Sequence, residues 1–312
     1  MSVASAPSAA EKSSKVAVPK PKRDIGDLKT AIWFILPSLI GFGVFFVWPT
    51  FRGIYLSFTN YDGSNRAPKW IGFANYQQMF SDPVLAKSLL VTLEYVLINI
   101  VVQTILALAI ALLMQKIATS TLSRGILLLP YFIANVIVAL VWFWMLDPNL
   151  GIINQFLEFI GIGSVSFFGS SALVIPTIAL VNVWRYMGYT ALLIFAGLQT
   201  IPSSVYEAAS LDGAGEVKQF FKITVPLLRP VLVLVLITSV TGSFQVFDTV
   251  AVTSKGGPAN ASNVIQYYIV DQAFNRSHFG YGAAISVLLF VILIVVALVQ
   301  FRVLRGRESD LA

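Results

Sequence analysis

The sequence contains no cysteine and a single histidine, His278, and these absences exclude several kinds of site. Without thiols the chain forms no disulfide framework, offers no thiol nucleophile and binds no zinc ion or iron–sulfur cluster through cysteine. One histidine also leaves no group of imidazoles that could bind a metal ion. We therefore expect neither a metal site nor thiol chemistry in this chain.

Charged residues are also scarce, because only 12% of the 312 residues are charged while 57% are hydrophobic. Soluble domains carry about 25% charged residues, so this chain lacks the polar side chains to coat a surface that faces water. The mean hydropathy of +0.79 excludes an ordinary soluble enzyme. The formal net charge of +6 does not indicate a nucleic acid as partner, since the basic residues lie between long apolar runs rather than on one folded face.

What the sequence does contain is six long apolar runs. A helix needs roughly 20 apolar residues to cross the hydrocarbon core of a bilayer, and in lipid its backbone groups must bond one another. We therefore predict an all-α integral membrane protein, surrounded by the lipid bilayer, with six transmembrane helices near Ala31 to Phe51, Leu89 to Met114, Gly125 to Leu146, Ala172 to Leu198, Thr224 to Val250 and Gly282 to Leu304.

The two ends of the chain differ from the spans. Residues 1–30 are rich in Ala, Ser, Lys and Pro, so we expect a disordered cytosolic tail there, followed by a membrane domain over residues 31–305 and a short cytosolic tail over residues 306–312. Lysine and arginine concentrate on the cytoplasmic side of membrane loops. Of the 21, fourteen fall in the first tail and the second, fourth and final connections, six fall in the other connections, and Arg185 lies within a span. Both termini are therefore predicted to be cytoplasmic.

The connection between the fourth and fifth spans reads IPSSVYEAASLDGAGEVKQFFKITVP and has the pattern of two short helices. Ser204 and Glu207 have the spacing of a capping box, so a helix is predicted to begin after Pro202. The pair Asp212-Gly213 predicts a turn, since glycine reaches positive φ without strain. A second short helix follows, with its apolar residues on one face: Val217, Phe220 and Phe221.

Polar residues inside two spans form stripes. In the fourth span one helical face carries Asn182, Arg185, Tyr186 and Tyr189. The fifth span has a similar stripe of Thr238, Thr241, Gln245 and Asp248. Aromatic faces together with amide and guanidinium donors suit a sugar-binding cavity. The alternative is an interfacial aromatic belt with Arg185 extended to the membrane surface, and the pattern leaves both open.

The connection between the fourth and fifth spans also carries a family motif. Its order is Glu-Ala-Ala, three residues, Gly, nine residues and Ile-x-Leu-Pro, and the matching residues are Glu207, Ala208, Ala209, Gly213, Ile223 and Pro226, with Val225 in place of the leucine. The segments LLLPYFIANVIV, NVWRYMGY and FQVFDTVAVTSKGGP extend the likeness across the spans. The chain therefore resembles the permease subunits of bacterial carbohydrate-uptake ABC importers, the maltose-type sugar permeases with the type I importer fold.

The resemblance implies that residues 201–223 are a coupling loop that inserts into a separate ATPase subunit. The residues implied in this contact are Glu207, Ala208, Ala209, Asp212, Gly213, Ile223 and Pro226. No cofactor is implied on this chain, since ATP and Mg²⁺ would be bound and hydrolysed by the ATPase, and the sequence has no G-x-x-x-x-G-K-[ST] phosphate loop. A second permease subunit and an extracytoplasmic sugar-binding protein are the other implied partners, and the implied location is the bacterial cytoplasmic membrane.

The resemblance also implies substrate contacts from the third, fourth and fifth spans. With the polar stripes, the residues expected to line the cavity are Tyr131, Asn182, Arg185, Tyr186, Tyr189, Ser239, Ser243, Gln245 and Asp248. Each serine could equally bond a neighbouring helix. The expected cargo is a di- or oligosaccharide, then an amino sugar, then a glycerol-phosphate-like polyol, because Arg185 could face an anion. The alternative class is an ion-coupled secondary transporter, although no inverted repeat supports it.

Overall fold

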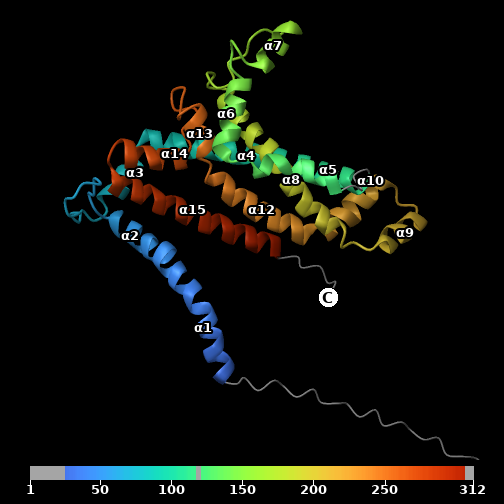
Figure 1. Cartoon of the computed structure of the whole chain (residues 1–312), viewed down its shortest axis with the longest axis horizontal. Helices are drawn as coiled ribbons and strands as arrows, with labels where there is room; N and C mark the ends of the chain where they lie inside the picture. The colour runs from blue at the N-terminus through green and yellow to red at the C-terminus, as the bar shows by residue number, and fades with distance from the viewer. Residues whose placement is uncertain (1–24, 117–120, 306–312) are drawn as a thin grey trace, which may run out of the picture. The chain divides into compact units, whose positions relative to one another are not determined.

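The computed structural model describes residues 25–116 and 121–305, so residues 1–24 of the tail predicted over residues 1–30, and the tail predicted over residues 306–312, lie outside this range. The described residues form helices and loops, with no strand beyond a single bridge between Thr59 and Trp70. The predicted all-α class is confirmed. The chain divides into two units, residues 1–51 and residues 52–312 (Figure 1).

The first unit is a nearly continuous helical run. It comprises α1 (Ile25–Phe42), the π-helical turn η1 (Gly43–Val47) and the start of α2 (Trp48–Leu56). The segment Ile32–Leu56 is long and apolar enough to cross a membrane. α1 begins at Ile25, inside the segment expected to be a disordered tail, because residues 25–30 contain no proline and nothing in them stops the helix of the first span from extending toward the N-terminus.

The second unit contains the remaining helices. In chain order they are α3 (Ala74–Phe80), α4 (Pro83–Lys116), α5 (Thr121–Phe132), α6 (Asn135–Met145), α7 (Ile152–Phe159), α8 (Val174–Leu198), α9 (Ser203–Leu211), α10 (Glu216–Gln219), η2 (Phe220–Thr224), α11 (Val225–Leu227), α12 (Arg229–Phe244), α13 (Asp248–Thr253), α14 (Ile265–Val270), η3 (Asp271–Asn275) and α15 (Phe279–Arg305). Four segments of this unit are long and apolar enough to span a membrane: Pro83–Gln115, Val174–Leu198, Arg229–Thr253 and Phe279–Arg302.

The predicted third span is bent. α5 and α6 qualify as a span only as a pair, and they meet at an angle of 90°. Pro130 lies just before the bend and has no N–H to continue the backbone ladder, and Ala134 then takes an extended conformation (φ −59°, ψ 140°) that separates the two helices. In the part of the chain that the structure describes, the six predicted spans correspond to five single candidates and one bent pair.

Three long helices form the centre of the second unit. α4 packs along α8, and α12 contacts both, as Figure 1 shows. One apolar cluster joins the three helices and includes Ala107, Ala191 and Val235, whose small side chains let the helices approach closely. A second apolar cluster, which includes Val91 and Ile178, joins α4 and α8 to α13. Between the two clusters lie polar residues of both long helices, Asn99 and Gln103 on α4 and Asn182 and Thr190 on α8.

Asp82 links the helices α4, α14 and α15 at one end of this unit. Its Oδ1 atom accepts hydrogen bonds from the backbone N–H groups of Val84 (2.9 Å) and Leu85 (3.1 Å) and so caps α4. Its Oδ2 atom accepts hydrogen bonds of 2.6 Å from the hydroxyls of Tyr268 in α14 and Tyr281 in α15. Partial burial raises the pKa of Asp82, but these four donors outweigh it, and the net pKa lies below its usual value.

Candidate functional site

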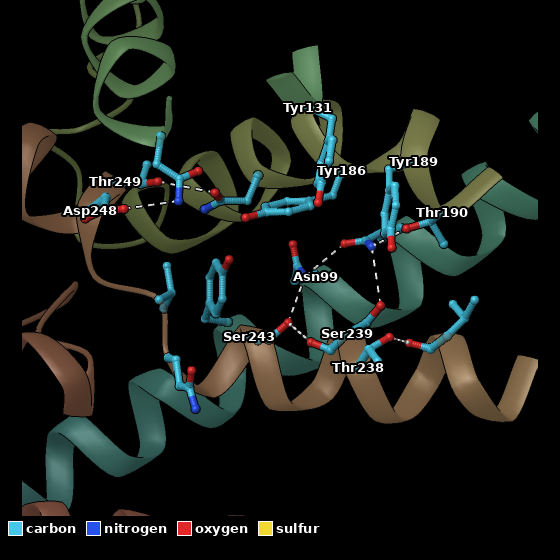
Figure 2. A pocket seen from close by; sticks show the side chains of 18 of the residues that line it. Asn99, Tyr131, Tyr186, Tyr189, Thr190, Thr238, Ser239, Ser243, Asp248 and Thr249 are labelled. Carbon is cyan, nitrogen blue, oxygen red and sulfur yellow. Dashed lines mark hydrogen bonds between the residues drawn. The ribbon is translucent and has the colours of Figure 1, made fainter. Parts of the chain in front are cut away.

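The long helices of the second unit surround a polar cavity of about 340 Å³ (Figure 2). Binding pockets for small molecules occupy about 300–1,000 Å³. Helices α4, α5, α6, α8, α12 and α13 all contribute side chains, and tyrosines, amides and hydroxyls dominate the lining. The cavity therefore has the size and the chemistry to hold a small polar molecule.

Helical spacing explains why each element presents several side chains to the cavity. On α4 the lining residues are four apart: Tyr95, Asn99 and Gln103. On α8 they are Asn182, Tyr186, Tyr189, Thr190 and Leu193. On α12 they are Val235, Thr238, Ser239, Gly242 and Ser243. Each set forms one stripe, and the packing of α4, α8 and α12 brings the three stripes together.

Amides from α4 connect the three helices across the cavity. Asn99 Nδ2 donates to Ser243 Oγ at 2.9 Å and to Gln103 Oε1 at 3.2 Å. Gln103 Nε2 donates to Thr190 Oγ1 at 2.8 Å and to Ser239 Oγ at 3.5 Å. Figure 2 shows these bonds between the serines of α12 and the residues opposite. Ser243 Oγ also donates to the carbonyl of Ser239 at 2.7 Å, so this hydroxyl serves helix packing.

Three tyrosines form an aromatic wall opposite α12 (Figure 2). The rings of Tyr131 and Tyr189 stack with their centroids 4.5 Å apart and their planes within 8° of parallel. Tyr186 meets Tyr131 edge to face at 5.9 Å. Flat apolar ring faces beside hydrogen-bonding groups match a sugar, whose C–H faces are apolar and whose rim carries hydroxyls.

The bend between α5 and α6 places Asn135 in the cavity wall. Asn135 Nδ2 donates to Asp248 Oδ2 at 3.1 Å, which joins the start of α6 to the start of α13. Thr249 Oγ1, next in the chain, donates to Asn182 Oδ1 at 3.3 Å. Figure 2 shows Asp248 and Thr249 at the end of the cavity away from Tyr189.

Arg185 corrects the expected set of lining residues. Its Nε and Nη2 atoms donate to the carbonyl of Ile133 at 3.1 and 2.9 Å, and Nη2 also donates to the carbonyl of Tyr131 at 3.1 Å. The guanidinium lies over the rings of Tyr186, at 4.6 Å, and Tyr131, at 5.7 Å, and the residue is absent from the cavity lining. The bend leaves carbonyls without helical partners, and inside a membrane these need a donor. Arg185 supplies it.

The other eight expected residues all line this one cavity: Tyr131, Asn182, Tyr186, Tyr189, Ser239, Ser243, Gln245 and Asp248. Sequence reasoning missed further lining residues: Tyr95, Asn99, Gln103, Asn135, Thr190 and Thr249. The signal for α4 was present, because its three polar residues repeat every four positions within an apolar run. No sequence signal indicated Asn135, since its position depends on the bend before it.

The connection after α8 forms two short helices, as expected. α9 begins at Ser203, directly after Pro202, but no side chain caps it, so the predicted capping box is not formed. Gly213 closes the turn with a φ of +76°. Gln219 Nε2 then donates to Ser210 Oγ at 2.9 Å and to the carbonyl of Ala214 at 2.8 Å, which fixes α10 against the end of α9.

The two helices present several side chains to solvent. Glu207, Ala208, Asp212, Gly213 and Pro226 are exposed, while Ala209 and Ile223 are half-buried. Large apolar side chains are exposed on the same loop: Leu211, Val217 and Phe221. The rigid shape and the exposed apolar and acidic side chains are properties of a docking surface rather than of a flexible linker.

A set of membrane-crossing helices around a buried polar cavity, with a rigid helical loop at one end, defines a solute permease. Comparison with known families agrees. Residues 103–308 match the family described as binding-protein-dependent transport system inner membrane component, and the chain belongs to that family. It is therefore a multi-pass inner-membrane component of such a transport system.

Several characterised proteins are similar along most of their length. The sulfoquinovosyl glycerol transport system permease protein SmoG of Agrobacterium fabrum is 32% identical, over 91% of this chain and 93% of its own. The trehalose/maltose transport system permease protein MalF of Thermococcus litoralis is 31% identical, over 91% and 96%. A chain from the crystal structure of a bacterial ABC transporter that imports the acidic polysaccharide alginate shares the fold, with a TM-score of 0.79 at 23% identity, over 92% of this chain and all of that one.

Proposed function

We propose that this chain is the membrane-spanning subunit of an ATP-driven sugar importer, and that the cavity between α4, α8 and α12 forms its part of the sugar path. The observation that supports this most is the cavity itself. The stacked pair Tyr131 and Tyr189 faces the amides and hydroxyls of α4 and α12 across a space of about 340 Å³. A di- or oligosaccharide offers an apolar face to such rings and hydroxyls to such amides.

Relatives support a sugar as cargo without selecting one. The names of similar proteins include sulfoquinovosyl glycerol, trehalose and maltose, and the similar fold belongs to an importer of alginate. These three proteins are at most 32% identical to this chain, so the residues that line their cavities can differ from those found here. We assign the class of cargo, a di- or oligosaccharide.

Energy for uptake comes, in this proposal, from a separate ATPase subunit that docks on the loop of residues 201–223. Glu207 and Asp212 supply charge at that contact, Ala208 and Ala209 let the partner approach, and Gly213 sets the turn between the helices. The ATPase binds ATP and Mg²⁺. Closing of the ATPase moves the loop, and the spans switch between outward-open and inward-open states as rigid bodies.

Two further partners complete the proposed importer. A second permease subunit forms the other half of the path, and an extracytoplasmic binding protein delivers the sugar. The binding protein is supported by the description of the family, which is that of binding-protein-dependent transport systems. A ligand alone only shifts the balance between two states, so the direction of transport must come from the nucleotide cycle.

The cavity assignment is tested with Tyr189. In proteoliposomes that contain the complete importer, Tyr189→Ala removes one ring of the stacked pair and is expected to lower sugar uptake roughly three- to tenfold, whereas Tyr189→Phe keeps the ring and most of the uptake. Phe80→Ala is the matched control, because Phe80 is a fully exposed aromatic residue on α3, outside the cavity. Equal uptake by Tyr189→Ala and the control would contradict the assignment.

A further inference from the structure

The cavity carries formal charge of only one sign. Asp248 is the one charged residue among those that line it, and no lysine, arginine or histidine is among them. Its Oδ2 atom accepts a hydrogen bond from Asn135, and none of the described cationic side chains forms an ion pair with it. An unpaired carboxylate among membrane spans is costly and faces a partner or a water-filled cavity. Here it faces the proposed path.

Two further oxygen atoms in the wall lack a donor. Asn99 Oδ1 and Asn135 Oδ1 are buried and accept no hydrogen bond. The Asn99 side chain is only 4% exposed, and its Nδ2 atom is already bonded to Ser243 and Gln103, which fixes the free oxygen in place. A buried polar atom without a partner costs about 1–3 kcal/mol. A ligand that donates hydrogen bonds would recover this cost once a small side-chain rearrangement exposes these oxygens to the cavity.

Arg185 does not compensate for Asp248. Its guanidinium lies over the rings of Tyr131 and Tyr186, and its donors are directed at the carbonyls of Tyr131 and Ile133. A phosphate, sulfonate or carboxylate in the cavity would thus find no charged donor among the described lining residues and would experience repulsion from Asp248. A hydroxyl group would find an acceptor in the carboxylate of Asp248.

We propose that the cavity admits sugars without negative charge and excludes those that bear a phosphate, sulfonate or carboxylate group, and that Asp248 determines this selectivity. The identification of the cargo as a sugar rests on the proposed function, whereas the charge selectivity rests on the cavity alone. The proposal removes the polyol phosphate from the expected cargoes. It also separates this chain from an importer of an acidic polysaccharide, despite the shared fold.

The absence of cysteine from the chain permits a test that needs no knowledge of the cargo. Gly242 lines the cavity, and a Cβ atom at this position meets no other atom within 4 Å, so Gly242→Cys places a thiol there without a clash. In the complete importer, this thiol is reacted with two reagents of similar size and opposite charge, trimethylammonioethyl and sulfonatoethyl methanethiosulfonate. Intact-mass spectrometry of this chain gives both rates, and a free cysteine peptide gives their intrinsic ratio.

The cationic reagent is expected to be favoured at Gly242→Cys by roughly three- to tenfold over the intrinsic ratio. Adding Asp248→Asn, which keeps an oxygen to accept from Asn135, is expected to remove most of this preference. Asp62→Asn, which changes an exposed carboxylate outside the cavity, is the matched control and is expected to leave the preference intact. If Asp248→Asn fails to assemble, added salt applied to Gly242→Cys alone should lower the preference.

Three results would overturn the proposal: an equal or faster reaction with the anionic reagent, a preference that is insensitive to both Asp248→Asn and salt, and no reaction at Gly242→Cys in any state of the importer. Failure of the proposed function is separate. An importer that keeps the charge preference but transports no sugar would contradict the proposed function alone, and an importer that transports sugar without the preference would contradict the charge selectivity alone.

Discussion

At the scale of single residues, the main finding concerns Arg185. Its stripe with Asn182, Tyr186 and Tyr189 could be predicted from the sequence, because helical spacing fixes which side chains share a face. Its role could not, because the carbonyls that it binds belong to Tyr131 and Ile133, more than 50 positions earlier in the chain, and are freed only by the bend between α5 and α6. Arg185 is therefore a positioning residue for the aromatic wall.

Replacing Arg185 tests this role. Arg185→Leu leaves the carbonyls of Tyr131 and Ile133 without these donors. A hydrogen bond from a charged group is worth about 1.5–3 kcal/mol. We therefore expect the melting temperature of the importer to fall by several degrees and uptake to fall with it. Arg185→Lys should lose less, since one ammonium can still reach a carbonyl. Unchanged thermal stability together with a changed choice of cargo would show that Arg185 contacts the sugar instead.

A second residue-scale prediction concerns Asp82 and pH. Its pKa is lower in the folded protein than the ordinary value of 3.8, so its ionised form adds stability that is present above that value and is lost as the pH falls through the folded pKa. Melting temperatures of the importer between about pH 6 and pH 3 should therefore fall less steeply for Asp82→Asn than for the parent. Tyr268→Phe removes one donor to Asp82 and so raises the pKa of Asp82 in the folded protein. In this variant the loss of stability should therefore be complete at a higher pH than in the parent. Identical slopes for all three proteins would contradict this account.

At the scale of elements, the sequence predicts the helices well and their interruptions poorly. Apolar runs located every span, because length and hydropathy alone decide what can cross a bilayer. The bend of the third span was missed, since a proline within a helix is compatible with a kink or with an end, and the outcome depends on which neighbour binds the freed carbonyls. The same bend explains why Asn135 was overlooked as a cavity residue.

The coupling loop gives a prediction at this scale. Gly213 has a φ of +76°, which costs an L-residue with a Cβ atom about 1–2 kcal/mol, so Gly213→Val should distort the turn between α9 and α10. Glu207→Ala removes an exposed charge from the same loop. Both changes are expected to reduce ATP-driven uptake while sugar binding to the assembled permease persists. Uptake and ATP hydrolysis measured on the same proteoliposomes show whether the two become uncoupled.

Glu158→Ala is the control for Glu207→Ala. Glu158 is an equally exposed glutamate on α7, which precedes α8, whereas α9 follows α8, so the two residues lie at opposite ends of this span. We expect Glu158→Ala to leave coupling unchanged. Full coupling in both Glu207→Ala and Gly213→Val would mean that another part of the chain engages the ATPase.

At the scale of the whole molecule, the distribution of polar and apolar residues is the clearest indication of the function. Charge is scarce, and among the described residues the polar side chains of α4, α8 and α12 gather around a cavity. The cavity has no pair of carboxylates and no histidine with which to perform acid–base chemistry. The molecule is suited to move a solute with energy supplied from elsewhere, and this is the claim on which the account depends.

The most direct test is sugar accumulation in proteoliposomes that contain the complete importer with its binding protein, supplied with ATP and Mg²⁺ and with no ion gradient. The account predicts that sugar accumulates against its gradient, that accumulation stops when the ATPase subunit is omitted, and that Glu207→Ala weakens it. Accumulation that an ion gradient drives through this chain without the ATPase would contradict the account.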